Sequence, residues 1–292
     1  MALLKTVAEI KLYFNVDGSF DFNTVLPYVE LAEDDVKRIL GDDQYEELDD
    51  YYNGVASGLT ELDDLLPFCQ RSIVYFAFLK GLDKFNVSIG NNGIAIIHNT
   101  NLAPASEKRV ENLRQNITDS GWDSLEFLLQ FLETNIDDYP LWESSDSYAY
   151  QYAYLINSAR DFDELFRIKR SRLTFLDWRS TMADVELLQI NPVVSVELMD
   201  ELKTQIKANT VSVNNNLILN HLRKALAYLV AAKQDYPKMQ PTGEHYLMLV
   251  RTMLDASPDD YPTYKTSSVY DADLESYEKY ENEEDSNVGV FG

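Results

Sequence analysis

One short pattern of residues closes two separate stretches of helical sequence, and this repetition limits the folds open to the chain. Asp137-Asp138-Tyr139-Pro140 recurs as Asp259-Asp260-Tyr261-Pro262. Upstream, residues 39–48 align without a gap with residues 193–202. Four positions of the following helical stretch also correspond, namely Leu65, Arg71, Ala77 and Asp83 with Leu217, Arg223, Leu229 and Asp235. Because a repeated unit indicates a tandem architecture, we predict two helical units from an internal duplication.

Apolar residues recur at spacings of three and four along most of the chain, which is typical of helices that bury one face. In residues 60–82 the apolar positions cover nearly the whole circumference, so we expect that helix in the core. The predicted fold class is therefore mainly α.

One segment, at about residues 86–98, breaks the helical period. β-Branched residues flank Asn92-Gly93, the pair preferred in a type I′ turn, so we predict a β-hairpin inserted in the first unit. The offset between the two copies is 152 residues at Leu65 and Leu217 but 122 at the tetrapeptides. We therefore expect the second unit to lack about thirty residues, including the hairpin.

These features divide the chain into four parts. We predict a first helical unit at residues 1–141, a connecting segment at 142–170, a second, shorter helical unit at 171–262 and an extended acidic tail at 263–292. From residue 256 to the end, ten acidic residues stand against two lysines, a composition that cannot bury enough apolar surface to fold alone. The apolar residues Val288, Val290 and Phe291 of this tail are either a solvated end or a plug for a groove on a partner.

The charge of the whole chain narrows the classes of function. Its 292 residues carry 49 acidic against 25 basic side chains, a net charge of −24, while 45% hydrophobic residues indicate a folded protein. Such acidity disfavours nucleic-acid binding over a broad surface, which needs clustered Lys and Arg. The single cysteine, Cys69, rules out an intramolecular disulfide and fits a reducing compartment. Without an apolar signal region or membrane span, we expect a soluble protein that is intracellular when made.

We find no residue pattern for catalysis, for a cofactor or for a metal. The three histidines, His98, His221 and His245, belong to no H-E-x-x-H motif, and the chain contains no G-x-S-x-G elbow. Neighbouring acidic residues on a helix point about 100° apart and do not converge. We therefore expect no enzyme, no cofactor and no metal.

One stretch is locally basic, with Arg167, Lys169, Arg170 and Arg172 within six residues. Arginine pairs with carboxylates through two parallel hydrogen bonds, so an acidic surface is the expected partner. Three interpretations stay open, namely pairing within the fold, a subunit or partner contact, and phosphate binding. We take these four residues, with the three apolar tail residues, as candidate contact residues.

Several segments carry a resemblance to a known group of proteins. Thr6-Val7-Ala8-Glu9-Ile10, Phe20-Asp21-Phe22 and Ile39-Leu40-Gly41, with residues 28–33, 156–160 and 171–176, resemble uncharacterised structural proteins encoded in phages and prophages of Bacteroides-type gut bacteria. The resemblance covers most of the chain up to about Pro262. It implies a structural virion protein, similar to the head–tail connector or adaptor rings that dock beneath the portal of tailed phages. Such adaptors are helical bundles with a projecting β element and an extended C-terminal segment that reaches a neighbour or the portal. The tandem duplication departs from the smallest connectors.

The same resemblance implies the partners and the location. We expect a homo-oligomeric ring, twelve-fold by resemblance, that contacts the portal protein and other neck or tail proteins, assembles in the host bacterial cytoplasm and ends in the virion. DNA would pass through without specific binding, because acidic walls repel phosphates. No membrane is expected. The alternative is a non-virion acidic binding module, either an assembly chaperone or a DNA-mimic inhibitor.

Overall fold

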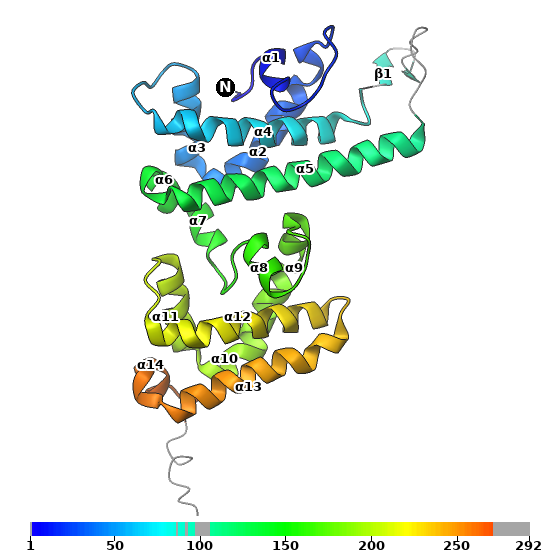
Figure 1. Ribbon diagram of the computed structural model, residues 1–292. Helices are drawn as coiled ribbons and strands as arrows, with labels where there is room; N and C mark the ends of the chain where they lie inside the picture. The colour runs from blue at the N-terminus through cyan, green and yellow to red at the C-terminus, as the bar shows by residue number, and fades with distance from the viewer. Residues whose placement is uncertain (1, 86, 91–92, 97–105, 271–292) are drawn as a thin grey trace, which may run out of the picture. The chain divides into compact units, whose positions relative to one another are not determined.

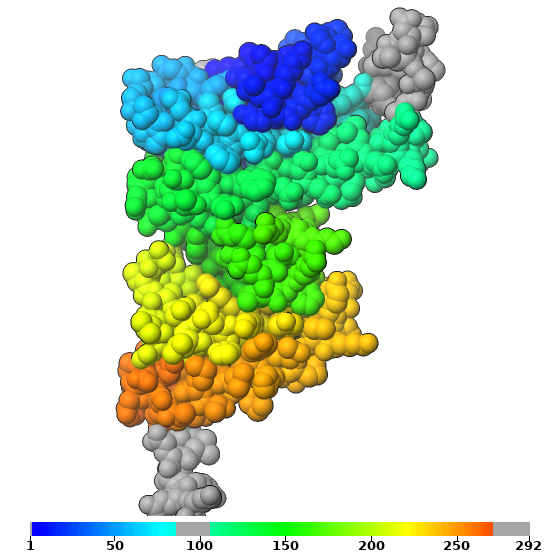
Figure 2. Space-filling model, in the orientation of Figure 1, coloured from blue at the N-terminus to red at the C-terminus, as the bar shows by residue number. Residues whose placement is uncertain are grey.

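The computed structural model describes residues 2–85, 87–90, 93–96 and 106–270, and these are mainly helical (Figure 1). The chain separates into two compact units, residues 1–180 and 181–292. Within each unit, side chains fill the spaces between the ribbons (Figure 2). The predicted fold class, mainly α, is confirmed.

The first unit has a core of three long helices and their shorter neighbours. The long antiparallel pair α4 and α5 packs together, and α2 packs against α4 (Figure 1). The helices of this unit are α1 (Val7–Ile10), α2 (Leu26–Leu40), α3 (Asp42–Tyr52), α4 (Glu61–Gly81), α5 (Glu107–Thr134), α6 (Pro140–Glu143), α7 (Asp146–Gln151) and α8 (Ala159–Leu165), and α9 (Arg172–Val185) begins in it.

Helix α4 is the centre of the core because nearly every face of it is apolar. Leu65, Ile73 and Ala77 are all fully buried, which confirms the expectation of a core helix at residues 60–82. Helix α5 buries a narrower stripe, in which Leu128 and Leu132 are fully covered. This stripe has the three- and four-residue spacing expected of a helix that is solvated on its other side.

Residues 142–170 pack within the first unit rather than standing between the units. Trp142 is fully buried, and its indole N–H donates a 3.0 Å hydrogen bond to the carbonyl oxygen of Ile39. Phe162 is also fully buried and lies against Trp178 of α9, with ring centroids 5.5 Å apart. The division between the units therefore falls inside α9, after Ser180, which is later than the predicted start of the second unit at residue 171.

Two short strands lie between α4 and α5. Strand β1 (Val87–Gly90) pairs with β2 (Gly93–Ile96) in antiparallel register, with Val87 opposite Ile96 and Gly90 opposite Gly93. The predicted turn pair is Asn92-Gly93, but Gly93 lies in β2, opposite Gly90. Asn92 and residues 86, 91 and 97–98 lie outside the described residues.

The second unit is a smaller helical body. It contains the end of α9, a π-helical turn η3 (Glu186–Ile190), α10 (Asn191–Val194), α11 (Val196–Lys207), α12 (Val213–Lys233), α13 (Gln240–Ala256) and α14 (Pro262–Lys265). Helices α12 and α13 pack along each other as an antiparallel pair (Figure 1). Leu222, Leu226 and Leu229 of α12 are fully buried, so α12 is the core helix of this unit.

The predicted tail begins too early. Tyr264 is fully buried, and its hydroxyl donates a 2.6 Å hydrogen bond to Asp255 at the end of α13. This aromatic anchor holds α14 on the second unit, so folded structure continues past residue 263. Residues 271–292, with Val288, Val290 and Phe291, lie outside the described residues.

The two units share local geometry at matching points of the sequence. Helices α4 and α12 each have 21 residues. Gly41, which precedes α3, has φ 81° and ψ 165°, and Ser195, which precedes α11, has φ 79° and ψ 156°. The hydroxyl of Tyr139 donates to a carbonyl oxygen at the start of α4, that of Glu61, and the hydroxyl of Tyr261 donates to one at the start of α12, that of Asn214.

Candidate functional site

The turn between α8 and α9 is locally basic, and we name Arg167, Lys169 and Arg170 the basic turn. All three are exposed, and within the described residues none of them forms an ion pair. Ile168 between them is buried, and its N–H donates a 2.7 Å hydrogen bond to Asp163. The turn is therefore anchored by Ile168 and presents its cationic side chains to solvent.

The backbone of this turn takes an unusual conformation. Lys169 and Arg170 have φ values of 59° and 53°, in the left-handed region that disfavours residues with a Cβ by roughly 1–2 kcal/mol each. Two successive residues in this region reduce the stability of the unit, and favourable packing elsewhere in it offsets this loss. Such strain is often found where a surface is shaped for a contact.

Arg172 occupies a different environment, and this corrects its assignment as an accessible partner contact. Its side chain is 2% exposed, and its Nη1 donates to Glu126 of α5 at 2.9 Å. Its Nη2 lies 3.4 Å from the side-chain oxygen of Gln151. Burial lowers the pKa of Arg172, and the Glu126 carboxylate opposes that shift. Arg172 thus follows the first of the three interpretations, pairing within the fold.

The flanking arginines also form contacts within the unit. Arg179 is buried, donates a 2.6 Å hydrogen bond to the carbonyl oxygen of Tyr150, and lies 4.2 Å from the centroid of the Tyr150 ring. Arg160 contacts Glu133 and Asp161 at 3.3 Å each. Arg160 therefore holds this stretch on α5, and Arg179 holds α9 on Tyr150. The three side chains of the basic turn are exposed.

The sequence did not predict the partners of Arg172. Glu126 lies 46 residues away and Gln151 lies 21 residues away. The one available signal was that Glu126 adjoins the apolar stripe of α5, next to the buried Leu125. A carboxylate at the edge of a buried stripe needs a cationic or hydrogen-bonding partner, although the pattern does not say which one.

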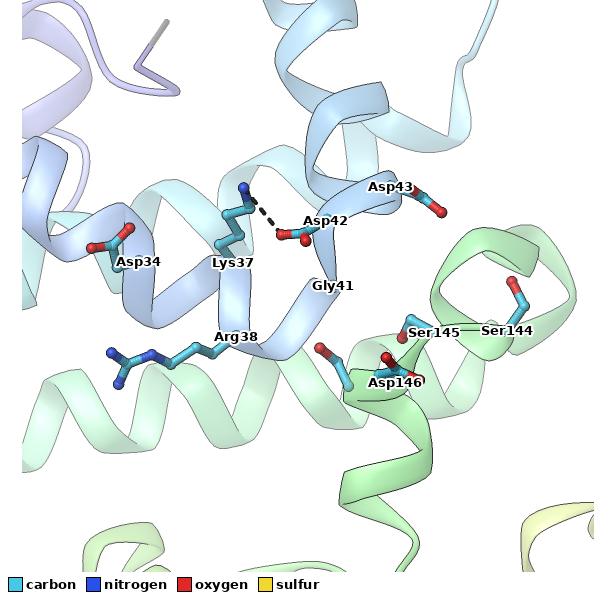
Figure 3. A pocket seen from close by; sticks show the side chains of 10 residues that line it. Asp34, Lys37, Arg38, Gly41, Asp42, Asp43, Ser144, Ser145 and Asp146 are labelled. Carbon is cyan, nitrogen blue, oxygen red and sulfur yellow. Dashed lines mark ion pairs between the residues drawn. The ribbon is translucent and has the colours of Figure 1, made fainter.

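Two cavities open on the first unit near these residues. The larger, about 640 Å³, lies where α2 ends and α3 and α7 begin (Figure 3). Lys37 and Asp42 pair across its wall at 3.1 Å, and Asp34, Asp43 and Asp146 also line it. The smaller, about 270 Å³, lies among α2, α5, α7 and α9, and Arg172 is in its lining.

The described residues contain no group of three His, Cys, Asp or Glu side chains placed to hold a metal ion. Cys69 is fully buried, and burial raises the pKa of its thiol. None of the helices in the described ranges combines the length and the apolar character of a membrane span.

Comparison with known proteins gives one match. A model for a family of unknown function (DUF6712) matches residues 36–152, 190–234 and 233–273, which is more than half of the chain. The matched segments lie in both helical units. No curated protein and no solved structure shows significant similarity to the chain.

Proposed function

The chain belongs to this family of unknown function, and from that premise we propose that it is a structural virion protein of a tailed bacteriophage. Within that class we propose a head–tail connector, a homo-oligomeric ring in the neck between portal and tail. The proposal rests on the resemblance to phage connector proteins and on one observation, the basic turn. It includes assembly in the host cytoplasm, a final location in the virion and no catalytic role.

The basic turn supports a contact between copies because of the charge around it. In a chain with a net charge of −24, three exposed cations without an ion pair among the described residues are suited to meet an acidic surface. A second copy of the same chain, with 49 acidic residues, is one source of such a surface. A contact between two different surfaces of identical copies closes into a ring when the rotation allows it.

The acidity supports the proposed passage of DNA. Phosphates are repelled by carboxylates, so a strongly acidic ring would leave the DNA mobile. Three cations per copy are few beside the 49 acidic residues of each chain.

We infer further that the two units arose by duplication, with a hairpin and an acidic tail as additions. Glu33 in α2 and Glu186 in η3 are both buried acids that precede a left-handed residue, Gly41 or Ser195. The acids are 153 positions apart and the left-handed residues 154. A π-helical turn such as η3 accommodates one extra residue in a helix, so it accounts for this difference.

The proposal is tested by the size of the full-length protein in solution, alone and with purified portal, by native mass spectrometry. We expect a ring for the wild type. The variant Arg167→Glu/Lys169→Glu/Arg170→Glu should lose the ring and keep its helical circular dichroism. The matched control Lys11→Glu/Lys108→Glu/Arg109→Glu makes the same change of charge at exposed residues elsewhere and should keep it.

Two results would contradict the proposal. A wild-type protein that stays monomeric with portal would exclude the ring, and equal assembly of both variants would exclude the basic turn as the contact. Mass spectrometry of purified virions separates the proposal from the alternative of a non-virion acidic binding module, because only a structural component remains in the particle.

A further inference from the structure

The smaller cavity of the first unit combines an apolar wall with a buried cation, and we name it the arginine cavity. Its apolar wall includes Trp122, Leu125 and Leu129 of α5. Its polar lining includes Arg172 of α9 and Arg38 of α2. Cavities that bind small molecules typically have this composition, a mostly apolar lining with a few placed polar groups.

Arg172 is a polar group of the lining whose hydrogen bonding is incomplete. Both of its terminal nitrogens have partners, Glu126 and Gln151. Its Nε, although buried, has no hydrogen-bond partner among the described residues. Because a buried donor without a partner is costly and rare in native proteins, an additional acceptor beside Arg172 would complete its hydrogen bonding.

The charges around the cavity indicate which kind of hydrogen-bond acceptor would pair with Arg172. A guanidinium group favours a carboxylate, which accepts two parallel hydrogen bonds. Glu126 already lies on Arg172, and Asp35 also lines the cavity. These two carboxylates repel a dianion such as phosphate more strongly than a monoanion, so a single carboxylate is the better fit.

The volume and the apolar wall of the cavity indicate what the ligand carries besides its carboxylate. The volume is about 270 Å³, and an apolar cavity of about 150 Å³ is large enough to bind benzene. The space therefore admits one aromatic ring and a short chain. Trp122 supplies an aromatic partner for such a ring, in stacked or edge contact.

We propose that the arginine cavity binds a small carboxylate with an aromatic body, of the arylalkanoate class. The carboxylate lies at Arg172 with Arg38 nearby, and the ring lies against Trp122. This site is independent of the proposed ring assembly and of the basic turn.

Binding in the cavity can be followed by the fluorescence of Trp122. The chain has two other tryptophans, Trp142 and Trp178. The full chain is titrated with 3-(4-bromophenyl)propanoate, whose heavy atom quenches nearby tryptophan fluorescence. The matched control probe is 3-(4-bromophenyl)propan-1-ol, which has the same ring without the charge. We expect saturable quenching by the acid and about tenfold or more weaker binding of the alcohol, the loss expected for a hydrogen bond to a charged group.

Three variants locate the binding. Trp122→Phe should remove most of the quenching, because Trp142 and Trp178 are not in the lining. Ser147→Phe, at a half-buried residue of the lining, should block entry. Arg172→Lys should weaken the acid and leave the alcohol unchanged, and if this variant does not fold, Arg38→Gln tests the same preference at an exposed position. Absence of quenching, equal affinity for acid and alcohol, or quenching that persists in Trp122→Phe would each overturn the proposal.

Discussion

The carboxylate of Glu33 accepts a hydrogen bond from the backbone N–H of Leu3. On the other side, the side-chain amide of Gln70 donates a 2.8 Å hydrogen bond to the Leu3 carbonyl oxygen. Leu3 and Leu4 are both buried. Two side chains from α2 and α4 thus replace the backbone partners that a strand would have, and they fix the N-terminal segment in the core of the first unit.

Glu33 should make the stability of this unit depend on pH. Burial raises the pKa of Glu33 from 4.5 to about 7, against the effect of the hydrogen bonds from Leu3 and Tyr45. Between pH 4.5 and 7 the folded state then holds more protons than the unfolded state, so stability falls as pH rises through this window and levels off above it. The total fall from this group is up to about 3 kcal/mol.

Urea unfolding at pH values from 4.5 to 8 measures this effect. The variant Glu33→Gln should lack the contribution of Glu33 to the slope, while Glu30→Gln, at an exposed position of the same helix, should follow the wild type. Equal slopes for Glu33→Gln and the wild type would show that folding leaves the pKa of Glu33 unchanged.

The sequence predicts the helices and the repeated elements of this protein better than its contacts. The apolar periodicity of residues 60–82 is enough to identify the core helix, because a helix that is buried on every side has apolar residues on every side. The hydrogen bond between Leu3 and Glu33 spans 30 residues, and no local pattern encodes it. Arg172 shows the same limit, because it is buried although its three basic neighbours in the sequence are exposed.

Replacing Ser195 by glycine should stabilise the protein. Its φ of 79° with ψ of 156° lies in a region almost reserved for glycine, at a cost of about 1–3 kcal/mol. Its hydroxyl accepts a 3.2 Å hydrogen bond from the N–H of Leu198 as a helix cap, but replacing a serine cap by glycine costs only a few tenths of a kcal/mol. We therefore expect Ser195→Gly to stabilise the protein by about 1 kcal/mol in urea unfolding.

The matched change at the corresponding position should have the opposite sign. Gly41 has the same conformation, and a Cβ placed there would lie 2.8 Å from the Cβ of Ser145. Gly41→Ser combines this clash with the backbone strain, so we expect a loss of more than about 2 kcal/mol. Stabilisation by Gly41→Ser, or destabilisation by Ser195→Gly, would contradict the equivalence of the two positions.

The ion pair of Arg172 and Glu126 should be costly to break and inexpensive to replace. Glu126→Gln leaves the buried guanidinium without its charged partner, for which we expect a loss of about 3–5 kcal/mol. The double variant Arg172→Met/Glu126→Met removes both charges and should lie much closer to the wild type. Lys265→Gln, in a pair with exposed side chains, serves as the control and should change stability by less than about 1 kcal/mol. In a cycle with the single variants Arg172→Met and Glu126→Met, losses of unfolding free energy that simply add in the double variant would exclude coupling between Arg172 and Glu126.

Glycine substitutions in the basic turn should stabilise the unassembled protein and weaken its assembly. Lys169→Gly/Arg170→Gly removes the left-handed strain of both residues, so we expect a gain of about 1 kcal/mol in the unfolding of the unassembled protein, after allowing for the greater freedom of glycine in the unfolded chain. The same variant loses two of the three exposed cations and should assemble more weakly. Lys169→Ala/Arg170→Ala removes the same charges but keeps the strain, so it should assemble as weakly without the gain in stability. If both variants assembled like the wild type, the cations of Lys169 and Arg170 would have no role in holding copies together.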